Sequence, residues 1–171
     1  MRAAIVTCGG LCPGLNVVIR EIVMSLCYNY KVKTIYGIQF GYRGFYNYDW
    51  IELTPEKVKT IHHLGGTILG SSRGGFDLEK IVNGLDARHV NQLYVIGGDG
   101  THYGMQKIQA DVAKKGIKLA ICGLPKTIDN DIPIIDKSFG FETSVEVIFF
   151  LILNKFIIYC RRQKKLFSRP M

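Results

Sequence analysis

Two loops of this sequence carry residue types that could handle a phosphate ester. Residues 97–101 read Gly-Gly-Asp-Gly-Thr. Glycines let backbone N–H groups approach an anion closely, and Asp99 between them is suited to hold Mg²⁺ against phosphate oxygens. Thr101 has the residue type of a helix N-cap. The alternative is a tight turn in which Asp99 only caps the following helix.

The second loop, residues 125–131, reads Pro-Lys-Thr-Ile-Asp-Asn-Asp. In an extended segment, Asp129 and Asp131 would face the same side. One carboxylate could then accept the proton of a substrate hydroxyl while the other binds a metal or tunes the pKa of its partner. Thr127 could donate to a phosphoryl oxygen. The alternative is an ordinary turn, because Asp and Asn are common turn residues.

Two further loops are rich in glycine. Residues 9–14 (GGLCPG) precede a helical pattern and could bring backbone close to a nucleotide phosphate. Residues 71–75 (SSRGG) contain Arg73, which could clamp phosphate oxygens. An ordinary strand-to-helix turn and a solvated arginine are the respective alternatives.

The elements around these loops alternate between short apolar runs and helical periodicity. This alternation predicts a doubly wound α/β fold with a mostly parallel sheet, in which ligands bind beyond the carboxyl ends of the strands. Loops 8–14, 97–101 and 123–131 would then meet at one edge. The predicted strands are residues 3–6, 32–38, 93–96 and 119–122, and the predicted helices are residues 15–27, a segment marked by Ile81, Leu85 and Val90, and one marked by Met105, Ile108 and Val112 that stops at Gly116.

The charge of the chain is concentrated near its end. The 171 residues suffice for one core, and 22 Lys and Arg against 14 Asp and Glu give +8. Residues 147–171 hold six basic residues and no acidic one, so residues 1–146 carry only +2. This distribution argues against a nucleic-acid-binding face on the main domain.

The five cysteines show no zinc-binding spacing. They indicate reduced thiols in a cytoplasmic protein, and the first residues do not resemble a secretory signal. Cys8 and Cys12 flank a glycine loop, so a redox-sensing pair is the alternative.

Taken together and in order, these loops resemble the phosphofructokinase family over residues 1–146. GGDGT is shared with NAD kinases and lipid kinases, whereas PKTIDND beside GGLCPGLN is specific. The motifs that carry the resemblance are residues 9–16 (GGLCPGLN), 37–45 (GIQFGYRGF), 65–75 (GGTILGSSRGG), 97–101 (GGDGT), 125–131 (PKTIDND) and 138–143 (SFGFET).

The resemblance implies phosphorylation of fructose 6-phosphate by ATP, in glycolysis. Asp129 would be the general base for the sugar 1-hydroxyl, and Asp99 would hold Mg²⁺. Thr127, Ile128 and Asp129 would bind the sugar phosphate, with Lys126, Thr127 and Asp131 assisting catalysis. The nucleotide would be bound by Gly10, Arg73, Gly74, Gly98, Asp99, Gly100 and Thr101.

The phosphoryl donor is also suggested by the resemblance. Pyrophosphate-dependent relatives carry an aspartate at the position of Gly100, and this aspartate obstructs the nucleotide. Gly100 therefore leaves room for ATP. Lys126, in contrast, is the residue type found in the pyrophosphate-dependent class. Glycine at the first position with lysine at the second is similar to the plant-type ATP-dependent group. ATP is therefore the expected donor, and pyrophosphate is the alternative.

The resemblance ends after Glu146, so the expected division is a phosphofructokinase-like domain at residues 1–146 and an apolar, then basic tail at 147–171. Three interpretations of the tail remain: read-through or frameshifted sequence, a buried helix of a short isoform, or a membrane anchor. Residues 145–159 are short for a span, so membrane binding is not expected.

Family chains are considerably longer and form homo-oligomers, so a truncated fragment is expected. Such a fragment could be a catalytically inactive one that binds nucleotide or a full-length subunit. A different kinase of the superfamily, such as one acting on NAD, is disfavoured by PKTIDND.

Overall fold

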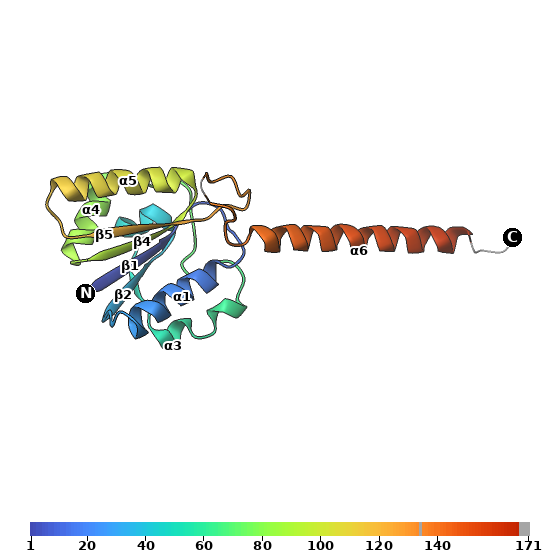
Figure 1. The fold of residues 1–171 in the computed structure, drawn as a ribbon, viewed down its shortest axis with the longest axis horizontal. Coiled ribbons are helices and arrows are strands. Elements are labelled where there is room, and N and C mark those ends of the chain that lie inside the picture. Colours follow the sequence, from blue (N-terminus) through green and yellow to red (C-terminus); the bar gives the residue numbers. More distant parts are fainter. Residues whose placement is uncertain (134, 168–171) are drawn as a thin grey trace.

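A five-stranded sheet forms the centre of the molecule (Figure 1). The computed structural model describes residues 1–133 and 135–167, from residue 156 onward by backbone alone. The strands follow the order β3-β2-β1-β4-β5, all parallel except β3, which runs antiparallel to β2. This confirms the predicted doubly wound, mostly parallel sheet. The strands are β1 (Arg2–Thr7), β2 (Thr34–Ile38), β3 (Ile51–Glu52), β4 (Gln92–Gly97) and β5 (Ala120–Pro125).

Helices cover both faces of the sheet because its inner strands are apolar on both sides. On one face Ala3 and Ile5 pack with Leu15 and Ile19 of α1, and on the other face Val6 packs in a cluster with residues of α4 and α5. The helices are α1 (Leu15–Tyr28), α2 (Gly44–Asn47), α3 (Pro55–Val58), α4 (Leu78–Ala87), α5 (Asp99–Lys114) and α6 (Phe141–Phe167), with 3₁₀ turns at Gly41–Arg43 and Ile61–His63.

Several boundaries differ from the sequence prediction by one to three residues; β2, for example, begins at Thr34 rather than at residue 32. Val90 is buried but lies beyond the end of α4, because the chain turns at His89, which has a positive φ. β5 runs to Pro125, three residues further than predicted. Thr101 is not the N-cap of α5: Gly98 takes that position, since its backbone is still extended when the helix begins at Asp99. The predicted stop at Gly116 is confirmed by its φ of 66°.

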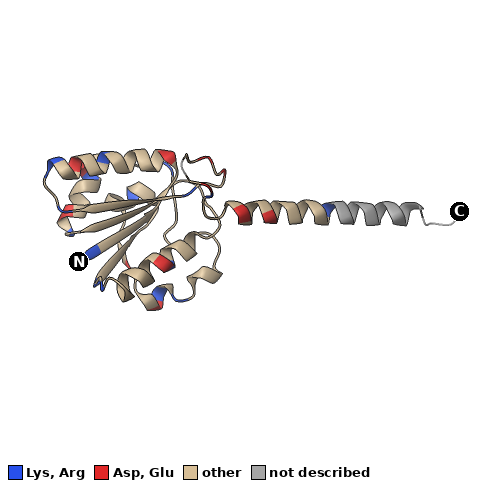
Figure 2. Ribbon diagram, in the orientation of Figure 1, with Lys and Arg blue, Asp and Glu red and all other residues tan. Residues whose placement is uncertain are grey.

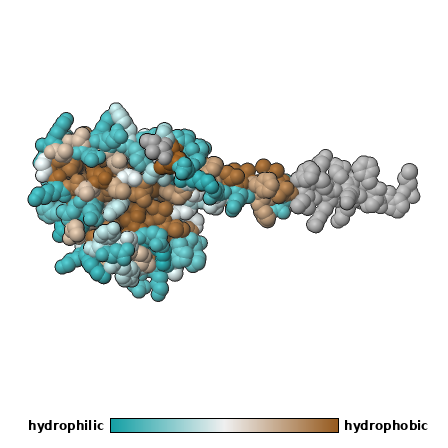
Figure 3. Space-filling view, viewed as in Figure 1, coloured by the Kyte–Doolittle hydropathy of each residue, from teal (hydrophilic) through white to brown (hydrophobic). Residues whose placement is uncertain are grey.

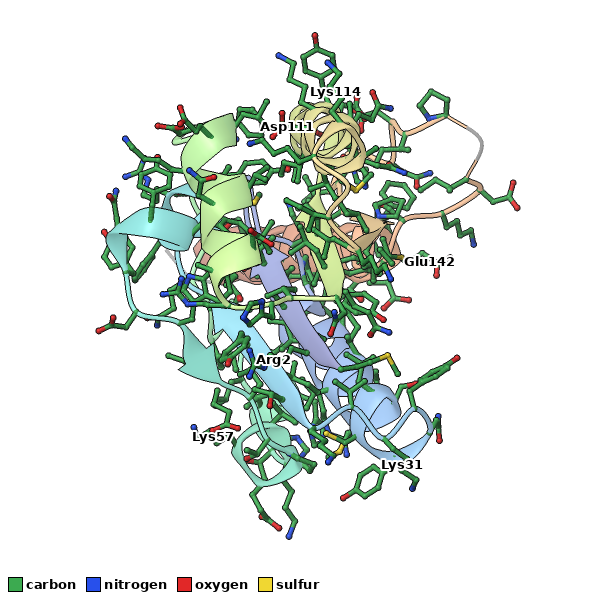
Figure 4. All side chains as sticks on the ribbon, turned by 90° about the vertical axis from the view of Figure 1, so that its left-hand side faces the viewer. Arg2, Lys31, Lys57, Asp111, Lys114 and Glu142 are labelled. Carbon is green, nitrogen blue, oxygen red and sulfur yellow. The ribbon has the colours of Figure 1, made fainter. Side chains whose placement is uncertain are left out.

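Charged residues are spread along the elements of the body rather than gathered on one of them (Figure 2). Viewed from the end opposite α6, Lys31, Lys57 and Lys114 lie at separate points of the periphery, and Arg2 lies nearer the middle (Figure 4). Arg2 begins β1, so this end of the sheet is the edge away from the carboxyl ends of the parallel strands. The absence of a basic cluster in this view agrees with the small net charge of residues 1–146.

The helix α6 extends away from the body as one continuous segment (Figure 1). Its first half is apolar, and the side chains of Val145 and Ile148 are about half exposed. Among the described residues, no helix combines the length and the apolar content that a membrane crossing needs.

Candidate functional site

The carboxyl ends of β1, β4 and β5 open into one cavity of about 580 Å³. The loops predicted to meet at this edge do meet there, since residues 8–11, 98–101, 126–129 and 131 contribute to the walls. The cavity is lined by every predicted site residue, namely Gly10, Arg73, Gly74, Gly98, Asp99, Gly100, Thr101, Lys126, Thr127, Ile128, Asp129 and Asp131.

The loop between β4 and α5 presents a helix N-terminus to the cavity. Thr101 N and His102 N both donate to the Gly98 carbonyl at 3.0 Å, which starts the helix immediately after the strand. Gly97 must lack a side chain, because a Cβ there would lie 2.5 Å from Thr101. The first-turn residue Asp99 is exposed at the cavity. Free N–H groups and the helix dipole make this end favourable for an anion.

The loop after β1 is held against residues 71–75. Gly9 N donates to the Ser72 carbonyl at 3.0 Å, and the Ser71 hydroxyl donates to the Gly9 carbonyl at 2.7 Å. These two bonds bring Arg73 beside the loop: a Cβ added at Gly10 would lie 3.8 Å from an Arg73 Nη atom. The guanidinium of Arg73 is therefore positioned at the same wall of the cavity as the Gly10 backbone.

Lys126 is the one buried lysine of the part of the chain that the structure describes, with 4% of its surface exposed. Its Nζ donates to the Gly10 carbonyl at 2.6 Å, and its backbone N–H donates to the Gly97 carbonyl at 2.9 Å. Burial lowers the pKa of Lys126, an effect that the neighbouring thiols of Cys12 and Cys8 partly oppose. The lysine therefore connects the loops that follow β1, β4 and β5. Its burial disfavours the charged form of the ammonium group.

Residues 127–131 form a turn, so the common orientation that an extended segment would give Asp129 and Asp131 does not arise. The Thr127 hydroxyl donates to Asp131 Oδ1 at 2.7 Å, and Asp129 N donates to Thr127 Oγ1 at 3.1 Å. Asn130 has a φ of 53° and its Oδ1 accepts from Ser138 N at 2.7 Å. Local side-chain bonds of this kind compete with extended backbone.

The carboxylates of Asp129 and Asp131 both line the cavity, but they differ in their hydrogen bonds. Asp131 accepts the hydrogen bond from Thr127, whereas no donor among the described residues reaches the carboxylate of Asp129. The exposed Asp129 carboxylate is therefore available to a ligand.

The motifs of the sequence did not indicate the aromatic end of the cavity. Tyr42, Phe76, Tyr103 and Lys107 also line it, with Tyr42 and Phe76 in edge-to-face contact at 5.1 Å. Lys107 Nζ lies 4.5 Å from the centre of the Tyr103 ring. Helical spacing could have found two of these residues, because Tyr103 and Lys107 follow Asp99 at intervals of four.

Tyr42 also forms a hydrogen bond to the first turn of α5. Its hydroxyl donates to the Thr101 carbonyl at 2.7 Å in a buried position. Burial raises the pKa of Tyr42 well above its usual value, and it raises the pKa of the adjacent Cys8 thiol to about 12. Cys8 and Cys12 are both free thiols. The protonated Cys8 is poorly suited to redox chemistry, because the thiolate is the reactive form.

Comparison with known proteins adds family information to this geometry. The sequence model described as phosphofructokinase matches residues 2–154. The chain is 58% identical over 146 residues to ATP-dependent 6-phosphofructokinase 7 of Arabidopsis thaliana, and 50% identical over 149 residues to the ATP-dependent 6-phosphofructokinase of Borreliella burgdorferi. These matches cover 85% of this chain but 30% and 33% of the two relatives.

Solved structures agree with the fold. Phosphofructokinase of Pichia pastoris in the T-state superposes with a TM-score of 0.80 at 26% identity, over 88% of this chain and 18% of that one. A pyrophosphate-dependent phosphofructokinase of Marinobacter aquaeolei gives a TM-score of 0.75 at 20% identity, over 82% of this chain and 37% of that one. The chain thus spans between 18% and 37% of the length of each of these four proteins.

Proposed function

The chain belongs to the phosphofructokinase family, and we propose that it carries the nucleotide-binding and catalytic loops of an ATP-dependent 6-phosphofructokinase. The reaction would transfer the γ-phosphoryl group of ATP to fructose 6-phosphate, giving fructose 1,6-bisphosphate. The observation that carries this proposal is the convergence of the helix N-terminus, Arg73, Lys126 and Asp129 on one cavity. Phosphoryl transfer depends mainly on positioning and on charge neutralisation, which such a set supplies.

The nucleotide would lie along the β1 and β4 ends of the cavity. Backbone N–H groups of Gly10, Gly98 and Gly100 would bind phosphate oxygens, because the glycines leave room for close approach. Thr101 would contribute its hydroxyl, since its own N–H donates to the Gly98 carbonyl. Arg73 and Gly74 would complete this wall from the opposite loop.

Asp99 would hold Mg²⁺ together with the phosphates. It is exposed at the cavity in the first turn of α5. The described residues contain no cluster of three or more metal-ligating side chains, which fits an ion held by one carboxylate, phosphate oxygens and water. When bound, the ion would neutralise charge on the transferred phosphoryl group.

Asp129 would take the proton from the 1-hydroxyl of the sugar. Its carboxylate is free, whereas Thr127 engages Asp131 and so fixes the turn. Thr127, Ile128 and Asp129 would contact the sugar phosphate, and Lys126 would add positive charge between sugar and nucleotide. Asp131 would act through Thr127 as a positioning residue.

A second candidate function follows from the length of the match. Because the chain spans about 30% of its Arabidopsis relative, much of a sugar-phosphate site could lie on segments that this chain does not contain. The candidate is a catalytically inactive fragment that binds MgATP or a full-length subunit. Under either function, residues 1–146 would be the family domain and residues 147–171 a separate tail, and the full-length form would be a homo-oligomer.

Two measurements on this chain separate the candidates: MgATP binding by calorimetry, and turnover of fructose 6-phosphate in a coupled assay. Asp129→Asn should lower turnover by roughly 10²–10⁴-fold and leave MgATP affinity within a factor of two. Asp86→Asn, an exposed change on α4, is the control. MgATP binding without turnover in the unmodified chain would favour the fragment, and near-normal turnover of Asp129→Asn would exclude Asp129 as base.

The donor can be tested at Gly100. A Cβ at this position meets no atom within 4 Å, so a larger residue can be accommodated by the fold. Gly100→Asp should nevertheless place a carboxylate at the phosphates and lower ATP affinity at least tenfold. Unchanged ATP binding would contradict the donor assignment.

The cytoplasm is the proposed location, although two of the Arabidopsis relatives are named chloroplastic. Fractionation of cells that express the complete protein, followed by immunodetection, tests this.

A further inference from the structure

The backbone that follows Arg73 is held by α2. Gly74 and Gly75 have positive φ angles of 76° and 70°, and two successive glycines have little conformational preference of their own. The Tyr46 hydroxyl donates to the Gly75 carbonyl at 2.9 Å. The other bond that a described residue makes to this stretch of backbone is longer, because an Arg43 Nη atom donates to the Arg73 carbonyl at 3.4 Å. Tyr46 therefore supplies the short anchor on this side of Arg73.

Tyr46 is presented by a well-anchored helix. Its neighbour Phe45 is buried and meets Trp50 edge to face, with the ring centres 5.6 Å apart. Gly75 packs directly on the start of α2, since a Cβ there would lie 2.8 Å from the Cβ of Arg43. The Tyr46 hydroxyl therefore reaches the Gly75 carbonyl from an element that the core keeps in place.

The side chain of Arg73 has no comparable support. It is exposed, and among the described residues its guanidinium has no hydrogen-bonding or ion-pair partner. Burial is the main cause of the lowered pKa of Lys126, and the positive charge of Arg73 adds to it. Because the two cations repel each other before an anion binds, the guanidinium stays beside Gly10 only as long as its own backbone is fixed.

We propose that Tyr46 is a positioning residue for Arg73, and that its hydroxyl keeps the guanidinium at the phosphate-binding wall of the cavity. The role rests on the proposed function, because the position of Arg73 matters only if the cavity takes a polyphosphate. Tyr46 is not among the residues that line this cavity, so it would act on a ligand through Arg73 alone.

The proposed role does not depend on the exposed apolar surfaces of the chain. Figure 3 shows apolar atoms at the start of α6 and in a band across the body between α5 and α1. The residues that hold the segment 71–75 by hydrogen bonds belong to none of these three helices. Whatever covers the apolar surfaces therefore leaves the contact between Tyr46 and Gly75 as it is.

Calorimetric titration of the full chain with MgATP and with inorganic tripolyphosphate tests the proposal. Tyr46→Phe keeps the ring and removes only the hydroxyl. We expect both probes to bind roughly three- to tenfold more weakly, because part of the binding free energy must then order the loop. Tyr48→Phe changes an exposed tyrosine directly after α2, and this control should bind both probes as the unmodified chain does.

A double-mutant cycle shows whether the effect passes through Arg73. When Arg73→Met is already present, adding Tyr46→Phe should change tripolyphosphate affinity by less than a factor of two. An equal loss in both backgrounds, or an unchanged affinity in Tyr46→Phe alone, would overturn the positioning role and leave the nucleotide site standing. If the unmodified chain bound neither probe, the proposed function itself would fail, and this role with it.

Limited trypsin digestion measures the loop without a ligand. Cleavage after Arg73 should be several-fold faster in Tyr46→Phe than in the unmodified chain, relative to cleavage after Arg88 at the end of α4. Tyr48→Phe should leave this ratio unchanged. An unchanged ratio in Tyr46→Phe would show that other contacts hold the loop, and the proposal would be overturned.

Discussion

Replacing Lys126 by methionine removes the buried ammonium group and keeps most of the apolar stem. Two opposing effects then decide the stability of the free protein. The bond from Nζ to the Gly10 carbonyl is lost, and a hydrogen bond from a charged donor contributes about 1.5–3 kcal/mol. The cost of burying the charge is also removed, and the lowered pKa shows that burial outweighs the favourable contacts. We therefore expect a loss of less than about 1 kcal/mol in unfolding free energy.

The binding of a polyphosphate should respond much more strongly. Among the described residues no carboxylate forms an ion pair with Lys126. A bound anion would supply such a partner, so the ammonium contributes most in the complex. Loss of one charge-assisted hydrogen bond of about 1.5–3 kcal/mol corresponds to roughly a 10- to 150-fold weaker MgATP affinity. In the unmodified chain, affinity should also fall as pH rises through the lowered pKa of Lys126, because only the protonated form attracts phosphate.

Urea denaturation and calorimetric titration with MgATP, each from pH 7 to 10, measure the two quantities separately. Lys118→Met, an exposed change at the opposite edge of the sheet, is the control. If Lys126→Met lost more than about 2 kcal/mol of stability and bound MgATP normally, the lysine would be a structural connection between loops. The reasoning from burial would then be refuted.

Three further changes test the packing around the site. Because the pKa of Cys8 is about 12 in the folded chain and 9.0 when exposed, stability should decline above pH 9 by up to about 1.4 kcal/mol per unit, and Cys8→Ala should reduce that slope in urea denaturation under reducing conditions. Tyr42→Phe removes the bond to the Thr101 carbonyl and should cost about 1–2 kcal/mol of unfolding free energy and weaken MgATP binding; an unchanged midpoint would contradict this. Gly123→Ala places a Cβ 2.6 Å from the His102 ring, so thermal unfolding should show a loss of about 1–3 kcal/mol, and a neutral result would mean that the ring moves aside freely.

The position of the site follows from the sequence because strand, loop and helix alternate. Once β1, β4 and β5 are parallel, their carboxyl ends share one edge, and the glycine and aspartate loops must come together there. Arg73 is different, since it lies in a loop that follows no strand of this sheet directly. Its place depends on the bonds of Ser71 and Ser72 to Gly9, which have no periodic signal.

The aromatic end of the cavity could not be predicted from the alternation of strands and helices. Tyr42 lies in a 3₁₀ turn, and Phe76 lies in a loop before α4, so neither belongs to a segment with a helical or strand period. What brings them together is tertiary: Gly104 on α5 has no Cβ, and one would lie 3.0–3.1 Å from both rings. A glycine inside a helix indicates close packing, but it does not say which side chains approach.

At residues 127–131 the sequence left two conformations open, an extended segment and an ordinary turn, and the structure has the turn. Alternation of residues alone does not decide between them, because it ignores the hydroxyl and amide groups of the segment itself. Thr127 and Asn130 satisfy neighbouring groups through side-chain bonds, and these bonds bend the chain. In an extended strand, Asp129 and Asp131 would have been equivalent. The turn makes them unequal, because Thr127 donates to Asp131, whereas no donor among the described residues reaches the carboxylate of Asp129. This difference is what supports the proposal of Asp129, rather than Asp131, as the base.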